Sequence, residues 1–172
     1  MAAHYETFIR AIPDFPRPGV IFRDITPMLG DADALRAVVH DLAAPFRQQH
    51  VDRVAAIEAR GFVLGAPLAV ELGAGFVPLR KAGKLPHETF SAQYELEYGD
   101  AAIELHQDGL RRGDNVLLVD DVLATGGTLA AAVELVRQAG ADVTGIVLLI
   151  ELTALNGRAR LPDQNVVSLI QY

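Results

Sequence analysis

The chain has 172 residues, of which 51% are hydrophobic, and its formal net charge is −7. This length and composition suit one ordinary domain with a buried core, and we expect a single domain over residues 1–172. The negative charge argues against a nucleic-acid partner, and the absence of cysteine excludes disulfides and thiolate metal sites. No apolar run is long enough to cross a membrane, so we expect a cytoplasmic protein.

The first 30 residues combine a short amphipathic helix, from Tyr5 to Ile9, with a stretch rich in proline. Prolines prevent a regular element from running through residues 13–19. Apolar residues on both sides of the prolines, among them Phe22, predict an ordered covering segment rather than a linker. From the residues alone, Phe22 could bind a ligand or simply fill the core.

A helix with one apolar face is expected next. Asp31 or Asp33 can cap its start, and apolar residues recur at helical spacing from Leu35 to Phe46. Pro45 should kink or end this helix.

A strand, a turn and a helix follow one another between residues 53 and 73. Arg53 to Ile57 read as a short strand, the turn is Glu-Ala-Arg-Gly, and Pro67 within the helix predicts a late start or a kink. Open parallel sheets bind ligands at the carboxyl ends of their strands. Arg60, which follows the strand, is therefore a candidate for binding rather than an ordinary surface residue.

A long polar insertion separates the strand at residues 76–79 from an alternating pattern at residues 101–105. Insertions of this kind, with no helical period, are usually hairpins or lids. Arg80, Lys81 and Lys84 form a basic cluster within it. The cluster is either a solvated charge run or a site for a polyanion.

The sequence VLLVDDVLATGGT, at residues 116–128, combines a buried strand, two acids and a loop of small residues before a helix that Gly140 can end. The first N–H groups of a helix lack partners and carry partial positive charge, so this loop predicts an anion site. Neither a Walker nor a Rossmann glycine pattern occurs in the chain.

The paired acids Asp120 and Asp121 would repel a phosphate unless they bind another part of the same ligand. Ribose hydroxyls fit that role. We therefore expect a phosphorylated sugar, with its 5′-phosphate on the loop, its hydroxyls on the acids, and Mg²⁺ nearby. The alternative, that the acids only cap the turn, is weaker because a cap needs one acid.

Two further strands are expected at residues 144–150 and 166–170, the second as an edge strand of the sheet. Alternating strands and helices predict an α/β fold with a mainly parallel sheet flanked by helices.

The thirteen residues VLLVDDVLATGGT closely resemble the phosphoribosyl-pyrophosphate (PRPP) signature of the type I phosphoribosyltransferase family, in the version of its adenine-specific members. The stretches PGVIFRDITP, EARG, YELEYG and ELTALNGRARL extend the resemblance over nearly the whole chain. It implies an N-terminal hood (residues 1–30), a flexible catalytic loop (residues 81–100), and a homodimer. The implied reaction is adenine plus PRPP to AMP plus pyrophosphate, in purine salvage.

The resemblance also assigns residues to the base and to the leaving group. Phe22 would stack on the base, the backbone of Ile21 and Arg23 would read its edge, and Val122 would support its other face. Pyrophosphate would be held by the Ala59 turn, with a cis non-proline peptide near Glu58 and Ala59, and by Arg60 as a catalytic residue.

Within the insertion, the resemblance places the catalytic acid–base residue at Glu97, before Tyr98, which is counted as substrate-binding. The residues alone do not distinguish Glu95 from Glu97. The family pattern assigns the remaining substrate contacts to Arg80, Lys81, Lys84, Asp120, Asp121, Ala124, Thr125, Gly126, Gly127 and Thr128. Some of the cations would reach a neighbouring subunit's site, and Mg²⁺ would be held mainly by PRPP.

Two alternatives remain open at this point. One is a phosphoribosyltransferase for another base, such as xanthine, because the hood backbone selects the base. The other is a PRPP-sensing regulator that lost catalysis. Glu97 in an intact lid, the acidic composition and the lack of a DNA-binding segment all favour the enzyme.

Overall fold

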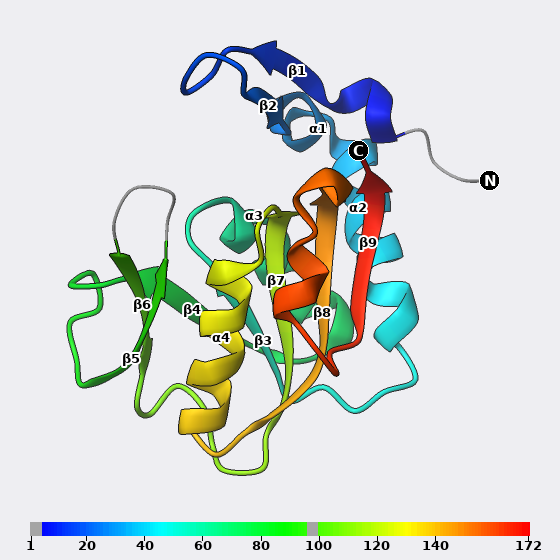
Figure 1. Ribbon diagram of the computed structural model, residues 1–172. Helices are drawn as coiled ribbons and strands as arrows, with labels where there is room; N and C mark the ends of the chain where they lie inside the picture. The colour runs from blue at the N-terminus through cyan, green and yellow to red at the C-terminus, as the bar shows by residue number, and fades with distance from the viewer. Residues whose placement is uncertain (1–4, 96–99) are drawn as a thin grey trace.

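The computed structural model describes residues 5–95 and 100–172 (Figure 1). Seven strands form one sheet in the order β5-β6-β4-β3-β7-β8-β9. The strands are β3 (Arg53–Ile57), β4 (Gly75–Lys81), β5 (Thr89–Glu95), β6 (Asp100–His106), β7 (Asn115–Leu123), β8 (Asp142–Glu151) and β9 (Val166–Gln171). Strands β4, β3, β7, β8 and β9 are parallel, which confirms the mainly parallel sheet and the edge position of β9.

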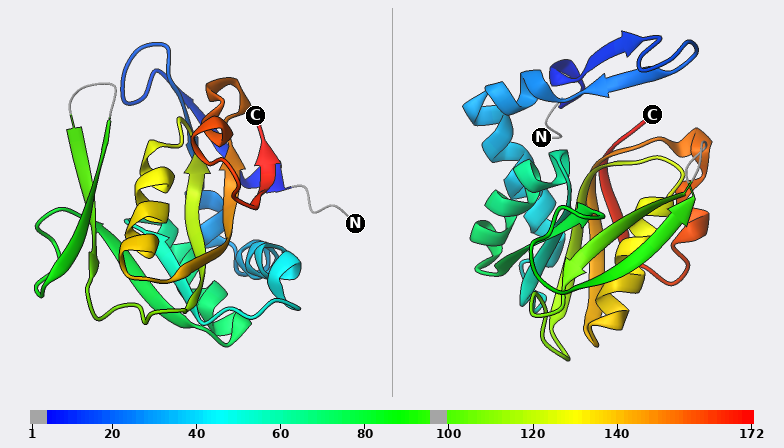
Figure 2. Two further views of the ribbon diagram at one scale, coloured as in Figure 1. Left: turned by 60° about the horizontal axis from the view of Figure 1, so that its bottom comes forward. Right: turned by 90° about the vertical axis from the view of Figure 1, so that its left-hand side faces the viewer.

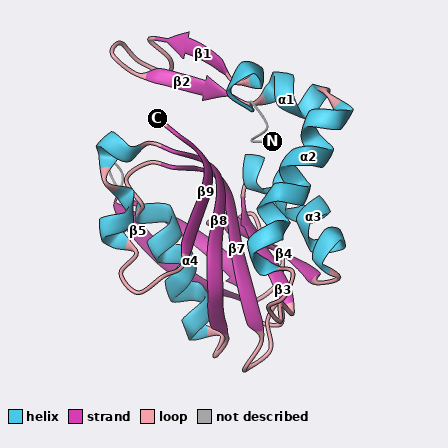
Figure 3. Cartoon of the chain, turned by 90° about the vertical axis from the view of Figure 1, so that its right-hand side faces the viewer, coloured by secondary structure: helices cyan, strands magenta, loops and turns pink. Residues whose placement is uncertain are grey.

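Helices cover both faces of this sheet. Helices α2 (Ala32–Ala43) and α3 (Arg60–Leu72) lie on one face, and α4 (Gly127–Gln138) lies on the other (Figures 1 and 3). Successive side chains of β7 point to opposite faces, so Leu118 joins the core beneath α4 while Leu117 joins the core beneath α2 and α3. Because both faces are buried, the central strands are apolar over residues 54–57 of β3 and 116–119 of β7.

Helix α2 begins and ends where the sequence predicted. The Asp31 carboxylate accepts hydrogen bonds from the N–H groups of Asp33 and Ala34, so Asp31 is the cap. Pro45 falls in the 3₁₀ turn Ala44–Phe46, directly after the helix ends. The other 3₁₀ turns are Tyr5–Phe8, Thr153–Leu155 and Gly157–Arg160.

Two element boundaries differ from expectation. Helix α3 begins at Arg60 and runs through Pro67, so the expected late start is wrong. Burial of Leu64 and Leu68 holds the helix on both sides of the proline, which lacks only one N–H donor. Strand β7 continues past Asp120 and Asp121 to Leu123, because its pairing with β8 extends to Glu151. The acids therefore lie within the strand and not after it.

The N-terminal segment is an antiparallel hairpin of β1 (Arg10–Pro13) and β2 (Ile21–Asp24), followed by α1 (Thr26–Gly30). It lies across the carboxyl ends of the parallel strands (Figures 1 and 2). The Tyr5 hydroxyl donates to the Asp41 carboxylate of α2 at 2.5 Å, which fixes the start of the segment. This hood segment is more regular than the covering loop expected, although no element runs through residues 14–19.

The polar insertion contains β5, which forms an antiparallel hairpin with β6 and extends the sheet beyond β4. Glu97 and Tyr98 lie outside the described residues, so their predicted roles stay predictions. Among the described residues, no helix combines the length and the apolar character that a membrane span requires.

Candidate active site

A cavity of about 370 Å³ lies where the carboxyl ends of β3 and β7 meet the starts of α3 and α4. Most of the residues that the sequence predicted for the site line it. They are Ala59, Arg60, Lys81, Asp120, Asp121, Val122, Ala124, Thr125, Gly126, Gly127 and Thr128. The two strand–turn–helix units found in the sequence therefore meet at one site.

The loop before α4 adopts a shape that requires glycine. Gly126 has φ +84° and precedes the first turn of α4, where Gly127 and Thr128 have no N–H partner within the helix. A Cβ at Gly126 would overlap the Gly157 carbonyl oxygen, and a Cβ at Gly157 would overlap the Ala124 carbonyl oxygen. The anion loop thus packs main chain against main chain on residues 157–160.

An ion pair between buried Glu151 and exposed Arg158 fixes this supporting turn. The Glu151 carboxylate accepts hydrogen bonds from Arg158 Nε at 2.6 Å and Arg158 Nη2 at 2.7 Å, and from the Ser168 hydroxyl at 2.6 Å. The Arg158 hydrogen bonds outweigh burial and lower the pKa of Glu151. Sequence reasoning missed Gly157, whose only signal was a glycine in the late ELTALNGRARL stretch.

The two acids of β7 are not equivalent. Asp121 is buried and accepts a hydrogen bond from Arg60 Nε, whereas Asp120 Oδ1 accepts one from the Asp121 N–H at 2.8 Å. Burial and the adjacent Asp121 carboxylate raise the pKa of Asp120 well above its ordinary value. The absence of a side chain at Gly61 lets α3 approach Asp120 closely, because a Cβ there would lie 3.1 Å from Asp120 Oδ1. Asp121 holds Arg60, and Asp120 is left for a ligand.

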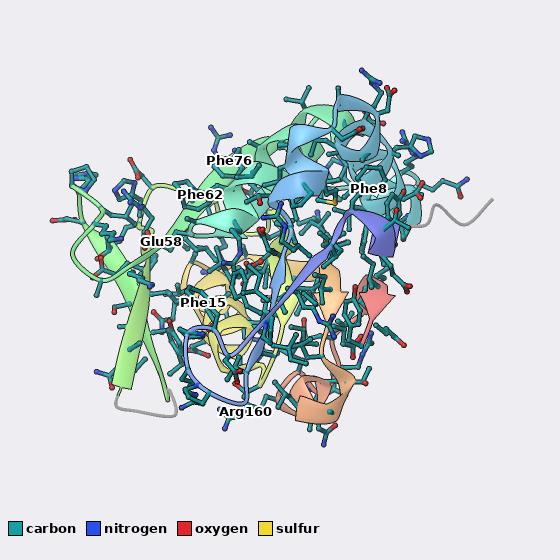
Figure 4. The ribbon with its side chains drawn as sticks, turned by 90° about the horizontal axis from the view of Figure 1, so that it is seen from above. Phe8, Phe15, Glu58, Phe62, Phe76 and Arg160 are labelled. Atoms are coloured by element: carbon teal, nitrogen blue, oxygen red, sulfur yellow. The ribbon has the colours of Figure 1, made fainter. Side chains whose placement is uncertain are left out.

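Arg60 also connects the cavity to the hood. Its guanidinium carbon lies 5.0 Å from the centroid of the Phe22 ring, which meets Phe15 edge to face at 5.2 Å. Phe15 is labelled in Figure 4, which views the molecule from the hood side. Phe22 thus lies next to Arg60, which lines the cavity, but is not itself among the lining residues, and its predicted stacking role stays a prediction.

A second, more apolar pocket of about 890 Å³ lies between the hood and the ends of β8 and β9, and it adjoins the first cavity at Ala124. The hood lines it with Ile21 and Arg23, and the facing wall includes Leu155 and Tyr172. The Arg23 guanidinium carbon lies 3.7 Å from the centroid of the Tyr172 ring. Sequence reasoning missed Leu155 and Tyr172, which lie far from the hood along the chain.

Two of the predicted cations contact Glu58 and do not line the first cavity. Arg80 Nε donates to Glu58 Oε2 at 2.9 Å, and Lys84 Nζ donates to Glu58 Oε1 at 2.8 Å. Burial opposes ionisation of this carboxyl, but Lys84 and Arg80 outweigh it and lower the pKa of Glu58. The Glu58–Ala59 peptide is cis, as expected. Glu58 itself was not among the predicted site residues.

Comparisons with known proteins agree with this geometry. A family model described as phosphoribosyl transferase domain matches residues 27–171. An adenine phosphoribosyltransferase from Nitrosococcus oceani is 58% identical over 97% of this chain and 98% of its own. The crystal structure of adenine phosphoribosyltransferase from Thermoanaerobacter pseudethanolicus has a TM-score of 0.97 at 49% identity and covers 100% of both chains.

The chain belongs to the adenine phosphoribosyltransferase family. The family resemblance of its signature is thereby confirmed. The domain model begins at residue 27 and so leaves out β1 and β2, whereas the adenine phosphoribosyltransferase structure covers the whole chain. The hood is thus part of the likeness to the adenine phosphoribosyltransferase family and not of the match to the general domain. A yeast member, complexed with an imino-altritol bisphosphate and adenine, has a TM-score of 0.93 at 38% identity over 98% of this chain and 97% of its own.

Proposed function

We propose that the protein transfers the 5-phosphoribosyl group of PRPP to N9 of adenine, giving AMP and pyrophosphate in purine salvage. The observation that carries this proposal is the adjacency of the anion cavity and the hood pocket, which share Ala124. One offers N–H donors and carboxylates, with Val122 on its wall, and the other runs along the hood at Ile21 and Arg23, so a planar base would lie where the two meet. The yeast relative binds a bisphosphate and adenine together, which supports the same pairing of ligands.

The cavity suggests a role for each group around the sugar. The N–H groups and hydroxyls from Thr125 to Thr128 would hold the 5′-phosphate at the start of α4. Asp120 would accept hydrogen bonds from the ribose hydroxyls, because Asp121 is already occupied by Arg60. These contacts would fix C1′ for attack by the base.

The site should stabilise the negative charge that develops on the leaving pyrophosphate during the reaction. The bond from C1′ to pyrophosphate would break ahead of attack, so negative charge grows on the leaving group. Arg60, Lys81 and the Ala59 backbone line the cavity where that charge would lie. The bond from adenine N9 to C1′ would then form, and Glu97 would take the N9 proton.

Mg²⁺ would enter the site with PRPP. Across residues 5–95 and 100–172, no three His, Cys, Asp or Glu side chains cluster to hold a metal ion. The phosphate and hydroxyl oxygens of PRPP are the ligand type that Mg²⁺ prefers, with Asp120 as a further donor on the cavity wall. The bound ion would neutralise part of the pyrophosphate charge.

We further infer that residues 1–172 form one domain, and that the protein works as a cytoplasmic homodimer. Val63 and Val70 of α3 and Phe76 of β4 are exposed to 43%, 83% and 37%, and Phe76 packs edge to face on Phe62 (Figure 4). Exposed apolar side chains on neighbouring elements suit a subunit contact. Light scattering of the purified protein tests the dimer.

A chromatographic product assay tests the reaction itself. Protein, Mg²⁺ and PRPP are incubated with adenine, hypoxanthine, guanine or xanthine in separate reactions. We expect AMP from adenine and no product from the other bases. A different nucleotide would overturn the base assignment, and no product despite measurable PRPP binding would favour the sensor.

A further inference from the structure

We propose that Glu58 is a positioning residue, which holds Arg80 and Lys84 beside the pyrophosphate end of the cavity before PRPP arrives. The inference rests on the proposed function, since it assigns this end of the cavity to pyrophosphate. Glu58 directly follows β3, next to Ala59 and Arg60, and lines the cavity. Figure 4 shows it on the side of the site nearest the β5–β6 hairpin.

The sheet fixes the backbone of Glu58, and the Glu58 side chain is nearly buried. Its N–H donates to the Leu79 carbonyl at 3.0 Å, so its backbone continues the pairing of β3 with β4. Its side chain is 6% exposed, against 36% for Arg80 and 50% for Lys84. A buried carboxylate stays ionised only when it is paired, so the two longer side chains are drawn to it.

Each carboxylate oxygen has its own cation. Arg80 Nε binds Oε2 and Lys84 Nζ binds Oε1, so neither cation displaces the other. One carboxylate against two cations leaves one positive charge in excess, and the cluster therefore still attracts an anion. Pyrophosphate leaving the cavity would meet this charge next to Glu58, which lines the cavity.

The same contacts order the chain that leads into the hairpin. Arg80 Nη1 donates to the Lys84 carbonyl at 3.2 Å, and the Gly83 N–H donates to Glu104 Oε2 at 3.0 Å. Long cationic side chains lose much conformational freedom when they are fixed. Because Glu58 fixes them in the free protein, less freedom is lost when PRPP binds.

The test replaces Glu58 by glutamine, which keeps the shape and removes the charge. In Glu58→Gln we expect the KM for PRPP, and for pyrophosphate in the reverse reaction, to rise about tenfold, with kcat and the adenine KM changed less than about twofold. Glu104→Gln is the matched control, because Glu104 anchors the same turn without contacting either cation in the described structure. The control should resemble the wild type.

A purely structural role would change both KM values together and lower the melting temperature, and that result would overturn the proposal. So would a PRPP KM that stays constant or falls. Lys84→Met provides a second test if the Glu58 variant does not fold. Lys84→Met should raise the PRPP KM alone. In the Lys84→Met protein, adding Glu58→Gln should raise the PRPP KM by a smaller factor than it does in the wild type.

Calorimetry of PRPP binding separates this proposal from the proposed function, since it needs no turnover. Wild-type protein that binds PRPP but makes no AMP would refute the reaction and leave the Glu58 comparison measurable. Equal PRPP affinities of the wild type and the Glu58→Gln variant would refute the positioning role even if AMP is made.

Discussion

The cavity proposed for PRPP and the pocket proposed for adenine are built in different ways. The PRPP cavity lies at the end of β7, whose two neighbours pair with it and whose Leu117 and Leu118 are fully buried. The adenine pocket lies under β1 and β2, which pair only with each other in the described structure. In this hood segment Phe15 and Ile21 are about half exposed, at 51% and 53%.

This difference separates a fixed site from an adaptable one. The PRPP cavity is held by sheet pairing, by glycine contacts between main chains, and by the pair of buried Glu151 with Arg158. Contacts between aromatic rings and guanidinium groups connect the hood to the rest of the molecule, at Phe22–Arg60 and at Arg23–Tyr172. We therefore expect substitutions near the PRPP cavity to have larger effects than substitutions at the hood.

The largest effect should come from Glu97, which lies outside the described residues. In Glu97→Gln we expect kcat to fall by about two orders of magnitude or more, because a positioned base typically contributes 10²–10⁴-fold. Both ligands should still bind, and calorimetry with PRPP and with adenine measures this directly. Near-wild-type kcat would remove Glu97 from the mechanism and leave Glu95 as the candidate.

Gly126→Ala should damage the PRPP cavity alone. The substitution strains a residue at φ +84° and forces its Cβ against the Gly157 carbonyl, so the loop must shift. We expect the PRPP KM to rise roughly 30-fold, with a few-fold change at most in the adenine dissociation constant measured by calorimetry. Gly30→Ala is the control, since a Cβ there meets no atom within 4 Å. Equal losses for both ligands would mean that the two regions are not independent.

Features built from one continuous stretch of chain could be predicted from the sequence, whereas features that depend on distant residues could not. The anion loop is contiguous, so residues 116–128 predict the strand, the loop and the helix together. Glu58 was missed because its partners lie 22 and 26 residues further along the chain. The continuation of β7 through both acids was missed because the partner strand β8 determines it. Tyr172 was missed because only the folded chain brings it to the hood.

At the hood, Tyr172→Ala should weaken adenine binding modestly. The ring lies 3.7 Å from the Arg23 guanidinium carbon and so supports the strand whose backbone is predicted to read the base. Contacts of this kind contribute about 0.5–1 kcal/mol when exposed, which corresponds to a two- to fivefold rise in the adenine KM. Tyr172→Phe keeps the ring and should restore the wild-type value. A larger change in the PRPP KM than in the adenine KM would contradict the division between the two regions.

The smallest effect should be a gain in stability from Asp120→Asn. The raised pKa of Asp120 means that the folded state binds the proton more tightly than the unfolded state does. Below the unfolded value, near pH 4, both states are protonated and the side chain makes no difference. As pH rises, the unfolded carboxyl ionises freely while the folded one is opposed by burial and by Asp121, so the wild type loses stability relative to the variant.

Denaturant unfolding should therefore show Asp120→Asn to be more stable by roughly 1 kcal/mol at pH 7, with the difference vanishing near pH 3. Asp121→Asn is the control of opposite sign, because it leaves Arg60 without the carboxylate it binds. A destabilised Asp120 variant at pH 7 would mean that the ionised carboxylate is favoured in the folded protein. The stabilised variant should bind PRPP more weakly, because the carboxylate that costs stability in the free protein is the one proposed to receive the ribose hydroxyls.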